Sequence, residues 1–244
     1  MKNHIIFDMD GVIIDSEPEY QKRIKIFMER NGFTITDELS FQICGSNRKD
    51  TYELFRENVP GFTMSYEAYN KGRDQVNAEY PLNLREIVNE DIYPLIEKLK
   101  ASGFHIGMAS SAPKEKILQN LGVLELTDYF DIIVSGQEFV HSKPDPEIYI
   151  YTMKKMGVEP KDCYVVEDST FGLQAAESAG AVVICKRDDR FGYDQSGADY
   201  YIDRLAEIED ICLGRKTVIN PFGIGYNRMI PLPGDFYESL LLYF

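Results

Sequence analysis

The chain begins with a short apolar run that ends in two acidic residues and a glycine. His4–Phe7 is followed by Asp8, Met9, Asp10 and Gly11. An apolar run of this length before a turn residue indicates a buried strand. Side chains at positions i and i+2 of extended backbone point to the same side, so the two carboxylates converge just beyond the strand. Two buried like charges require a cation or a shared proton, which predicts a metal-assisted site or an acid–base dyad.

The composition limits the classes of partner. The chain has 244 residues, a formal net charge of -14 and 44% hydrophobic residues. Nucleic acids and anionic membranes require a basic face, so neither is an expected partner. The four cysteines are scattered without a C-x-x-C spacing, and no apolar stretch approaches membrane-spanning length. We therefore expect a cytoplasmic protein, monomeric or weakly homo-oligomeric, that binds a small molecule.

From about residue 90 onward, short apolar runs alternate with segments of helical periodicity. Strands are predicted at Phe104–Ala109, Asp131–Val134, Tyr164–Val166 and Ala181–Cys185, with a short edge strand at Tyr200–Ile202. Helices are predicted between them, as at 114–121 and 171–179, each followed by a glycine that ends the helix. This alternation is typical of a parallel sheet with helices on both faces. The sequence therefore predicts an α/β fold with a doubly wound, Rossmann-like parallel sheet.

Residues 17–88 interrupt the alternation. They show no strand pattern, and Tyr20, Ile24, Phe27 and Met28 recur at helical spacing, which is typical of a helix core face. We predict a core of residues 1–16 and 89–216 and an inserted all-helical cap of residues 17–88. Residues 217–244 are poor in charge and rich in Pro, Gly and aromatic residues. They form a C-terminal extension of unknown role, and the sequence leaves open whether it contacts this domain or a partner.

Polar side chains follow the predicted strands directly. Asp8 and Asp10 follow the first strand, Ser110 follows the second, and Glu167 and Asp168 follow the strand at 164–166. The carboxyl ends of parallel strands meet at one edge of the sheet, where α/β proteins bind ligands. Lys143 lies in the loop after the strand at 131–134 and can reach the same edge. Carboxylate and hydroxyl oxygens without His or Cys favour Mg²⁺ over zinc, and with a lysine they suit phosphoryl transfer.

In this order, the motifs resemble those of the haloacid dehalogenase-like phosphotransferase superfamily. The similarity is to the branch of phosphatases and β-phosphoglucomutases with a helical cap, and it covers roughly residues 4–210. The matching residues are Asp8-Met-Asp10-Gly11-Val, Ser110, Lys143-Pro144 and Glu167-Asp168-Ser169, together with Asp15-Ser16-Glu17-Pro18 at the start of the cap.

The resemblance implies a role for each matching position. Asp8 would attack phosphorus and form an aspartyl-phosphate. Asp10 would protonate the leaving oxygen and then deprotonate the water that releases phosphate. Ser110 and nearby backbone N–H groups would bind the phosphoryl oxygens. Lys143 would offset the charge between Asp8 and the phosphoryl group.

The resemblance also implies a Mg²⁺ site and a substrate-reading cap. The metal would be bound by the Asp8 carboxylate, the Asp10 backbone carbonyl and Asp168, with Glu167 as a direct or water-mediated ligand. The cap would close over the site and exclude water. Within it, Glu17 and Arg48 match positions expected to contact substrate.

Three functions are compatible with these residues. Phosphatases and phosphomutases of this family share the core motifs, but β-phosphoglucomutases usually carry a histidine where this chain has Tyr20. We therefore predict Mg²⁺-dependent hydrolysis of a small phosphate monoester of the sugar or polyol class. The alternatives are a β-phosphoglucomutase-like phosphomutase and a catalytically silent binding or regulatory protein. The intact Asp8 and Asp10 argue against the second alternative.

Overall fold

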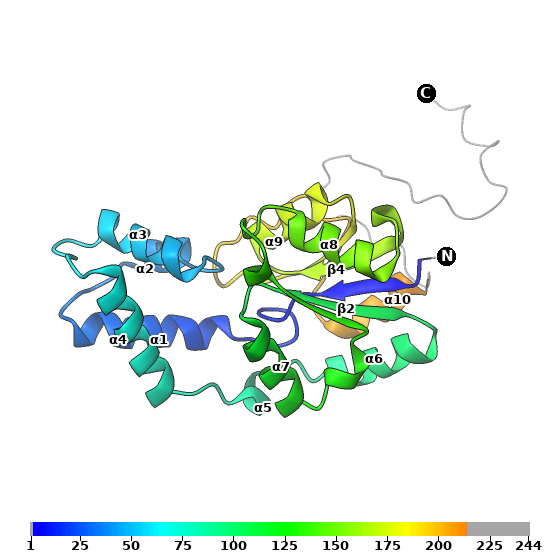
Figure 1. Ribbon diagram of the computed structural model, residues 1–244, viewed down its shortest axis with the longest axis horizontal. Coiled ribbons are helices and arrows are strands. Elements are labelled where there is room, and N and C mark those ends of the chain that lie inside the picture. The colour runs from blue at the N-terminus through cyan, green and yellow to red at the C-terminus, as the bar shows by residue number, and fades with distance from the viewer. Residues whose placement is uncertain (1, 214–244) are drawn as a thin grey trace, which may run out of the picture.

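The computed structural model describes residues 2–213, and these form a six-stranded sheet with helices around it and a helical segment at one end (Figure 1). The strands are β1 His4–Phe7, β2 His105–Ser110, β3 Ile132–Ser135, β4 Cys163–Glu167, β5 Val182–Lys186 and β6 Tyr200–Ile202. Every neighbouring pair is parallel, and the strand order is β3-β2-β1-β4-β5-β6. The predicted doubly wound parallel sheet is confirmed.

Helices cover both faces of the sheet. The α-helices of this part are α6 Ile92–Ala101, α7 Lys114–Val123, α8 Glu147–Met156, α9 Thr170–Ser178 and α10 Ile208–Cys212. Short 3₁₀ helices lie at Thr127–Tyr129, Gly136–Glu138, Pro160–Asp162 and Leu205–Glu207. Alternate residues of β1 enter different apolar clusters. Ile5 and Phe7 pack with α6 and α7, and Ile6 packs with α8 and α9. This two-sided burial explains why β1 reads as a continuous apolar run.

The chain between β1 and α6 is helical. Its elements are α1 Glu17–Arg30, α2 Asp37–Gln42, α3 Arg48–Asn58, α4 Tyr66–Glu79 and α5 Leu84–Ile87. Thr36, Asn47 and Ser65 cap α2, α3 and α4 by accepting hydrogen bonds from backbone N–H groups of the first turn. We call residues 17–88 the helical insert, as predicted from the sequence; its use as a separate cap domain stays a prediction.

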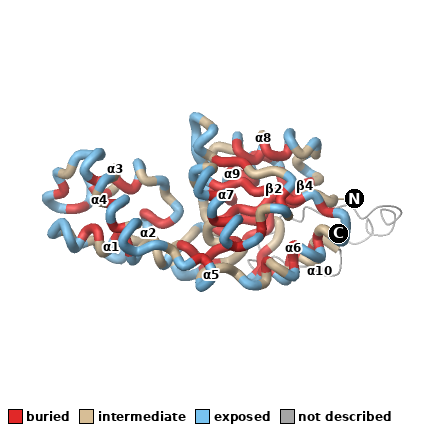
Figure 2. Tube along the Cα trace, turned by 60° about the horizontal axis from the view of Figure 1, so that its bottom comes forward, coloured by how far each residue is buried: buried red, intermediate tan, exposed pale blue. Residues whose placement is uncertain are grey.

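The helical insert has an apolar core of its own. Phe27, Phe55 and Tyr69 are buried there, together with Ile24 and Met28. Figure 2 shows these buried stretches separated from the buried strands of the sheet. The predicted helix face at Ile24, Phe27 and Met28 is therefore a core face, as the spacing indicates.

The strand order places the topological switch point of the sheet between β1 and β4. The chain passes from β1 to β2 and β3 on one side, and then crosses back to β4 on the other side of β1. At such a switch point the connections leave in opposite directions, which opens a space at the carboxyl ends of the two strands. Asp8 follows β1 there, and Glu167 ends β4. The predicted tail at 217–244 lies outside the described residues.

Candidate active site

Lys143 joins the ends of β1 and β4. Its Nζ donates hydrogen bonds to Asp8 Oδ1 at 2.7 Å and to Glu167 Oε1 at 2.6 Å. A third, longer bond goes to the backbone oxygen of Ala109 at 3.3 Å. The lysine side chain is only 7% exposed. Burial lowers its pKa, but the carboxylates of Asp8 and Glu167 outweigh this and raise the pKa well above its ordinary value, so the lysine stays charged.

Both carboxylate oxygens of Glu167 have hydrogen-bond donors. Oε1 accepts from Lys143 and from the hydroxyl of Tyr149, each at 2.6 Å. Oε2 accepts from the backbone N–H groups of Asp168 and Ser169 and from the Ser169 hydroxyl. Burial raises the pKa of Glu167, but Lys143 and these donors lower it below the usual range. The carboxylate is therefore ionised and fixed in orientation.

Asp168 is held differently. Its side-chain oxygens receive no hydrogen bond within residues 2–213, and the carboxylate packs against the backbone of Gly11. A Cβ on Gly11 would lie 2.0 Å from Asp168 Oδ2, and the φ of +80° at Gly11 also requires glycine. The backbone oxygen of Asp168 accepts a hydrogen bond from Gln195. Asp168 is therefore buried and fixed, with a carboxylate free to bind a ligand.

These acids fit a divalent cation. Asp8, Glu167 and Asp168 each offer an oxygen, and these oxygens lie within 4.8 Å of one another. Burial raises the pKa of Asp8 to about 7 against the opposing effect of Lys143, and burial together with Glu167 and Asp8 raises the pKa of Asp168 well above its ordinary value. Lys143 is the one cation in ion-pair contact with these three acids among the residues described. The surplus negative charge in an all-oxygen donor set favours a hard cation.

Asp10 lies beside this group and outside it. Its Oδ1 accepts a hydrogen bond from the Ser16 hydroxyl at 2.5 Å and a longer one from the Tyr20 hydroxyl at 3.4 Å. Burial raises the pKa of Asp10 against the effect of these bonds. A carboxyl group with a raised pKa can both give and accept a proton near neutral pH. Its predicted acid–base role stays a prediction.

Ser110 is the last residue of β2, at the same edge of the sheet. It is buried, and its hydroxyl accepts a hydrogen bond from the backbone N–H of Ala112. Ala109, the residue before it, contacts Lys143. Ser110 is therefore the next residue of β2 after the one that Lys143 contacts. Phosphate binding by Ser110 stays a prediction.

The two predicted substrate contacts of the helical insert differ in position. The Glu17 carboxylate accepts a hydrogen bond from Gln21 at 2.9 Å, and its pKa is raised by burial, with a smaller contribution from Asp10. Arg48 forms an ion pair with Asp74 of α4 at 2.6 Å and is partly exposed. Glu17 thus lies close to the acids of the core, whereas the ion-pair partner of Arg48 belongs to the insert. Their roles toward a substrate stay predictions.

Three residues of the site carry no signal in the sequence. Tyr149 and Gly172 fall at ordinary positions of amphipathic helices, and Gln195 lies in a loop. A Cβ on Gly172 would lie 2.0 Å from Glu167 Oε1, so only glycine leaves room for this carboxylate. These contacts join residues of different elements, which explains why spacing along the chain does not reveal them.

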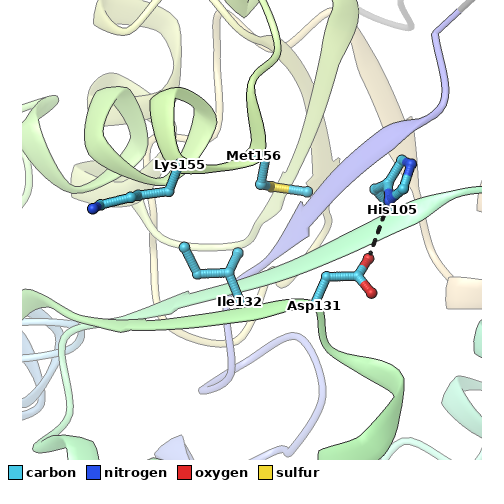
Figure 3. A pocket seen from close by; sticks show the side chains of 5 residues that line it. All are labelled: His105, Asp131, Ile132, Lys155 and Met156. Carbon is cyan, nitrogen blue, oxygen red and sulfur yellow. Dashed lines mark ion pairs between the residues drawn. The ribbon is translucent and has the colours of Figure 1, made fainter.

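A pocket of about 320 Å³ lies at the opposite edge of the sheet (Figure 3). It is lined by His105, Asp131, Ile132, Lys155 and Met156. His105 begins β2 and Asp131 precedes β3, so this is the amino edge, away from Asp8 and Lys143. Within the pocket, His105 faces Asp131 at 3.5 Å. The pocket therefore lies away from the acidic site and contributes no residue to it.

The sequence profile of the haloacid dehalogenase-like hydrolases matches residues 5–186. The chain belongs to this family. It is 33% identical over 178 residues to the phosphorylated carbohydrates phosphatase of Thermotoga maritima. The matched region makes up 72% of this chain and 81% of the relative. It is also 28% identical over 190 residues to the β-phosphoglucomutase of Bacillus subtilis, covering 74% and 81%. The predicted family is confirmed, and the phosphatases among its relatives support the predicted phosphoric monoester hydrolase.

A solved structure agrees with the fold of this haloacid dehalogenase-like hydrolase. The β-phosphoglucomutase of Clostridium difficile superimposes with a TM-score of 0.72 at 22% identity, covering 88% of this chain and 96% of that one. At this identity the likeness concerns the fold alone. In the part of the chain that the structure describes, no helix is both long enough and apolar enough to cross a membrane.

Proposed function

We propose that the chain is a Mg²⁺-dependent phosphatase that hydrolyses a small phosphate monoester through an aspartyl-phosphate on Asp8. The observation that carries this proposal is the placement of Lys143 between Asp8 and Glu167, with Asp168 in the same group of acids. One cation, several carboxylates and a site for a divalent ion suit attack on phosphorus, because the transferred group is anionic and its charge must be offset.

The contacts of Asp8 leave one oxygen for attack. Lys143 holds Oδ1, and no hydrogen bond to Oδ2 arises within residues 2–213. The lysine fixes the carboxylate and reduces the repulsion between it and an incoming phosphoryl group. Asp8 would attack phosphorus with its free oxygen while the alcohol of the substrate leaves on the opposite side. Phosphate release then requires water to attack the acyl-phosphate.

Asp10 is the proposed proton carrier for both steps. Its raised pKa favours the protonated form that can protonate the leaving alcohol. After the alcohol has left, the resulting carboxylate accepts a proton from the attacking water. Ser16 and Tyr20 both donate to Oδ1, so these two hydroxyls orient the carboxyl group, and Oδ2 accepts no hydrogen bond among residues 2–213.

Asp8 and Asp168, with the Asp10 backbone carbonyl, would bind Mg²⁺. A bound divalent ion would offset the charge of the phosphoryl oxygens and lower the pKa of Asp8. Glu167 has donors on both oxygens, so we propose that it acts chiefly by positioning Lys143 and Asp168.

The relatives and the helical insert support the proposed substrate class. Relatives include phosphatases named for phosphorylated carbohydrates and, in Escherichia coli, for fructose 1-phosphate. In this chain, Gly45 of the insert packs against Ser169 and Tyr193 of the core; a Cβ there would lie 3.5 Å from Ser169 Cβ. The insert therefore contacts the core beside Asp168, which suits a cap over a sugar or polyol phosphate.

The test is release of phosphate from p-nitrophenyl phosphate with and without Mg²⁺. We expect Asp8→Asn to abolish release, whereas Asp128→Asn, an exposed control, keeps wild-type turnover. Unchanged turnover in Asp8→Asn would overturn the nucleophile assignment. Both variants should keep the circular dichroism spectrum of the wild type.

A phosphomutase is the second candidate, supported by the β-phosphoglucomutase relative. Conversion of glucose 1-phosphate to glucose 6-phosphate without phosphate release would favour it over hydrolysis. Absence of both reactions across a panel of phosphate esters would favour a binding or regulatory protein.

A further inference from the structure

The chain between β5 and β6, residues 187–199, is held by polar side chains of its own. We call this segment the β5–β6 loop. It contains no helix or strand, and most of its residues are exposed or half-buried. A surface loop of this kind is normally mobile. Here Asp188, Arg190 and Gln195 each form several hydrogen bonds, and these bonds reach both the end of β4 and the entrance of the helical insert.

Gln195 uses both ends of its amide group. Its Nε2 donates to the backbone oxygen of Asp168 at 2.5 Å and to that of Lys186 at 3.2 Å. Its Oε1 accepts a hydrogen bond from the Asp188 N–H at 3.0 Å. Asp168 directly follows β4, and Lys186 ends β5. One side chain therefore joins the carboxyl ends of two neighbouring strands to the β5–β6 loop.

The contact with Gln195 fixes the backbone of a residue whose side chain is otherwise little restrained. Within residues 2–213, the Asp168 carboxylate receives no hydrogen bond, whereas both oxygens of Glu167 have donors. The peptide group between Asp168 and Ser169 accepts from Gln195 through its oxygen and donates to Glu167 Oε2 through its N–H at 3.3 Å. A side chain without hydrogen bonds takes its direction from its backbone and its packing. Gln195 therefore helps to set where the Asp168 carboxylate points.

Arg190 ties the same loop to the entrance of the helical insert. Its Nη1 and Nη2 donate to the two carboxylate oxygens of Asp15 at 2.9 and 2.8 Å, a paired geometry that fixes direction as well as distance. Asp15 lies two residues before α1, and its N–H donates to the backbone oxygen of Ile87, the last residue of α5. Arg190 therefore contacts the point where the chain enters the insert and leaves it again.

Asp188 joins these two contacts. Its carboxylate is only 6% exposed and accepts hydrogen bonds from Nε and Nη2 of Arg190 at 2.9 and 2.6 Å. Its N–H donates to Gln195. A continuous series of hydrogen bonds therefore runs from Asp15 through Arg190, Asp188 and Gln195 to the backbone of Asp168. Such a contiguous network can carry a change in position from one end to the other.

We propose that Gln195 is a positioning residue that sets the affinity of Asp168 for Mg²⁺, and that Arg190 makes this affinity depend on the placement of the helical insert. The inference rests on the proposed Mg²⁺-dependent phosphatase and adds to it a link between metal binding and the insert. Residues that hold a metal ligand in place contribute about ten- to a hundredfold to metal affinity. Linkage is reciprocal, so bound Mg²⁺ also restrains the connections of the insert at Asp15.

The first experiment measures Mg²⁺ affinity by calorimetry on protein freed of metal with EDTA. Gln195→Met keeps the length of the side chain and removes its three hydrogen bonds. We expect the Kd for Mg²⁺ to rise by at least about tenfold. Gln119→Met, a change of the same type at an exposed position of α7, should keep the Kd of the wild type. Excess Mg²⁺ should restore most of the turnover that Gln195→Met loses, which a general loss of folding would not allow.

The second experiment separates the insert from the metal ligand. Arg190→Gln removes the bonds to Asp15 and should raise the Kd for Mg²⁺ roughly two- to fivefold. Arg187→Gln is the matched control, because it removes the same charge and a paired contact to Asp203 beyond β6, away from the insert. If Arg190 acts through Gln195, the double variant Arg190→Gln/Gln195→Met binds Mg²⁺ no more weakly than Gln195→Met alone.

Amide hydrogen exchange gives a readout that needs neither metal nor turnover. In the metal-free protein, Gln195→Met should speed exchange at the Ser169 N–H, because its peptide group loses the contact with Gln195. In the wild type, Mg²⁺ should slow exchange at the Asp15 N–H, and this protection should be weaker in Arg190→Gln than in Arg187→Gln.

Two results would overturn the inference and leave the phosphatase proposal standing. An unchanged Kd for Mg²⁺ in Gln195→Met would show that Gln195 does not position Asp168. Equal shifts in Arg190→Gln and Arg187→Gln would show that the link to the insert has no effect on the metal. Absence of Mg²⁺ binding by the wild type would instead contradict the proposed metal dependence. Exchange at Ser169 in the metal-free protein would then decide alone whether Gln195 fixes the Asp168 backbone.

Discussion

Removal of the Tyr149 hydroxyl tests whether Glu167 acts by positioning Lys143. This hydroxyl is fully buried and donates to Glu167 Oε1 at 2.6 Å, the oxygen that also binds Lys143. Phenylalanine keeps the ring, whose centre lies 4.9 Å from Lys143 Nζ. Tyr149→Phe therefore removes one hydrogen bond to a charged acceptor and leaves the packing and the net charge unchanged.

The size of the effect follows from the remaining donors. Glu167 keeps Lys143 and the donors on its other oxygen, so the carboxylate stays in place with a weaker hold on one side. A hydrogen bond to a charged group contributes about 1.5–3 kcal/mol to stability. For a domain of this size we expect the melting temperature to fall by roughly 4–8 °C. Looser positioning of Lys143 should lower kcat by about tenfold.

The assay combines differential scanning calorimetry with phosphate release at saturating substrate. The matched control is Tyr151→Phe on the same helix, because the hydroxyl of Tyr151 has no hydrogen bond among residues 2–213. The Mg²⁺ concentration for half-maximal activity should change less than about threefold in Tyr149→Phe, since Asp8 and Asp168 lose no contact. A melting temperature within 1 °C of the control (about 0.3 kcal/mol) would refute the assigned role of the hydroxyl.

Three further outcomes are expected. Asp168→Asn should raise the Mg²⁺ concentration for half-maximal activity at least about tenfold, measured by titration of the metal-free protein. Gly172→Ala should lower the free energy of unfolding by about 1–3 kcal/mol in urea titrations, because the new methyl group would overlap Glu167. Asp131→Asn should destabilise the protein by roughly 1 kcal/mol at pH 7, after allowance for solvent screening, and by progressively less as the pH falls below about 4. Burial raises the pKa of Asp131, but the hydrogen bonds from Lys100 and the Ile106 N–H outweigh burial and lower this pKa in the folded protein. The ionised Asp131 therefore stabilises the fold at pH values above its pKa in the unfolded chain. This stabilisation is lost as the pH falls through its pKa in the folded protein. A pH-independent difference between Asp131→Asn and the wild type would contradict this assignment.

Much of the architecture was predictable because it depends on local patterns. The predicted strands agree with β2 to β6 to within one or two residues, since each is a buried apolar run between turn residues. The helical spacing of 17–88 correctly predicted helices in place of strands. Parallel pairing then follows from the alternation of strand and helix, and parallel pairing brings Asp8, Ser110 and Glu167 to one edge.

Three polar residues of the helical insert show where such prediction fails. Tyr20 occupies a position with the spacing of a core residue, yet its hydroxyl reaches Asp10. Arg23 and Arg73 are expected at a helix surface, because arginine is seldom fully buried without a partner. Their burial results from the packing of α4 against α1, which the sequence does not reveal.

The sequence by itself determined the parallel sheet, the helical insert and the family, because hydrophobic periodicity and short motifs act over a few neighbouring residues. Only the tertiary structure decided which groups hold Glu167, which glycines leave room for its carboxylate and which arginines are buried without a counter-charge. The physical reason is that hydrogen bonding, desolvation and steric fit depend on distances between elements. Residues as far apart in the chain as Asp8 and Lys143 meet only when the whole sheet has formed.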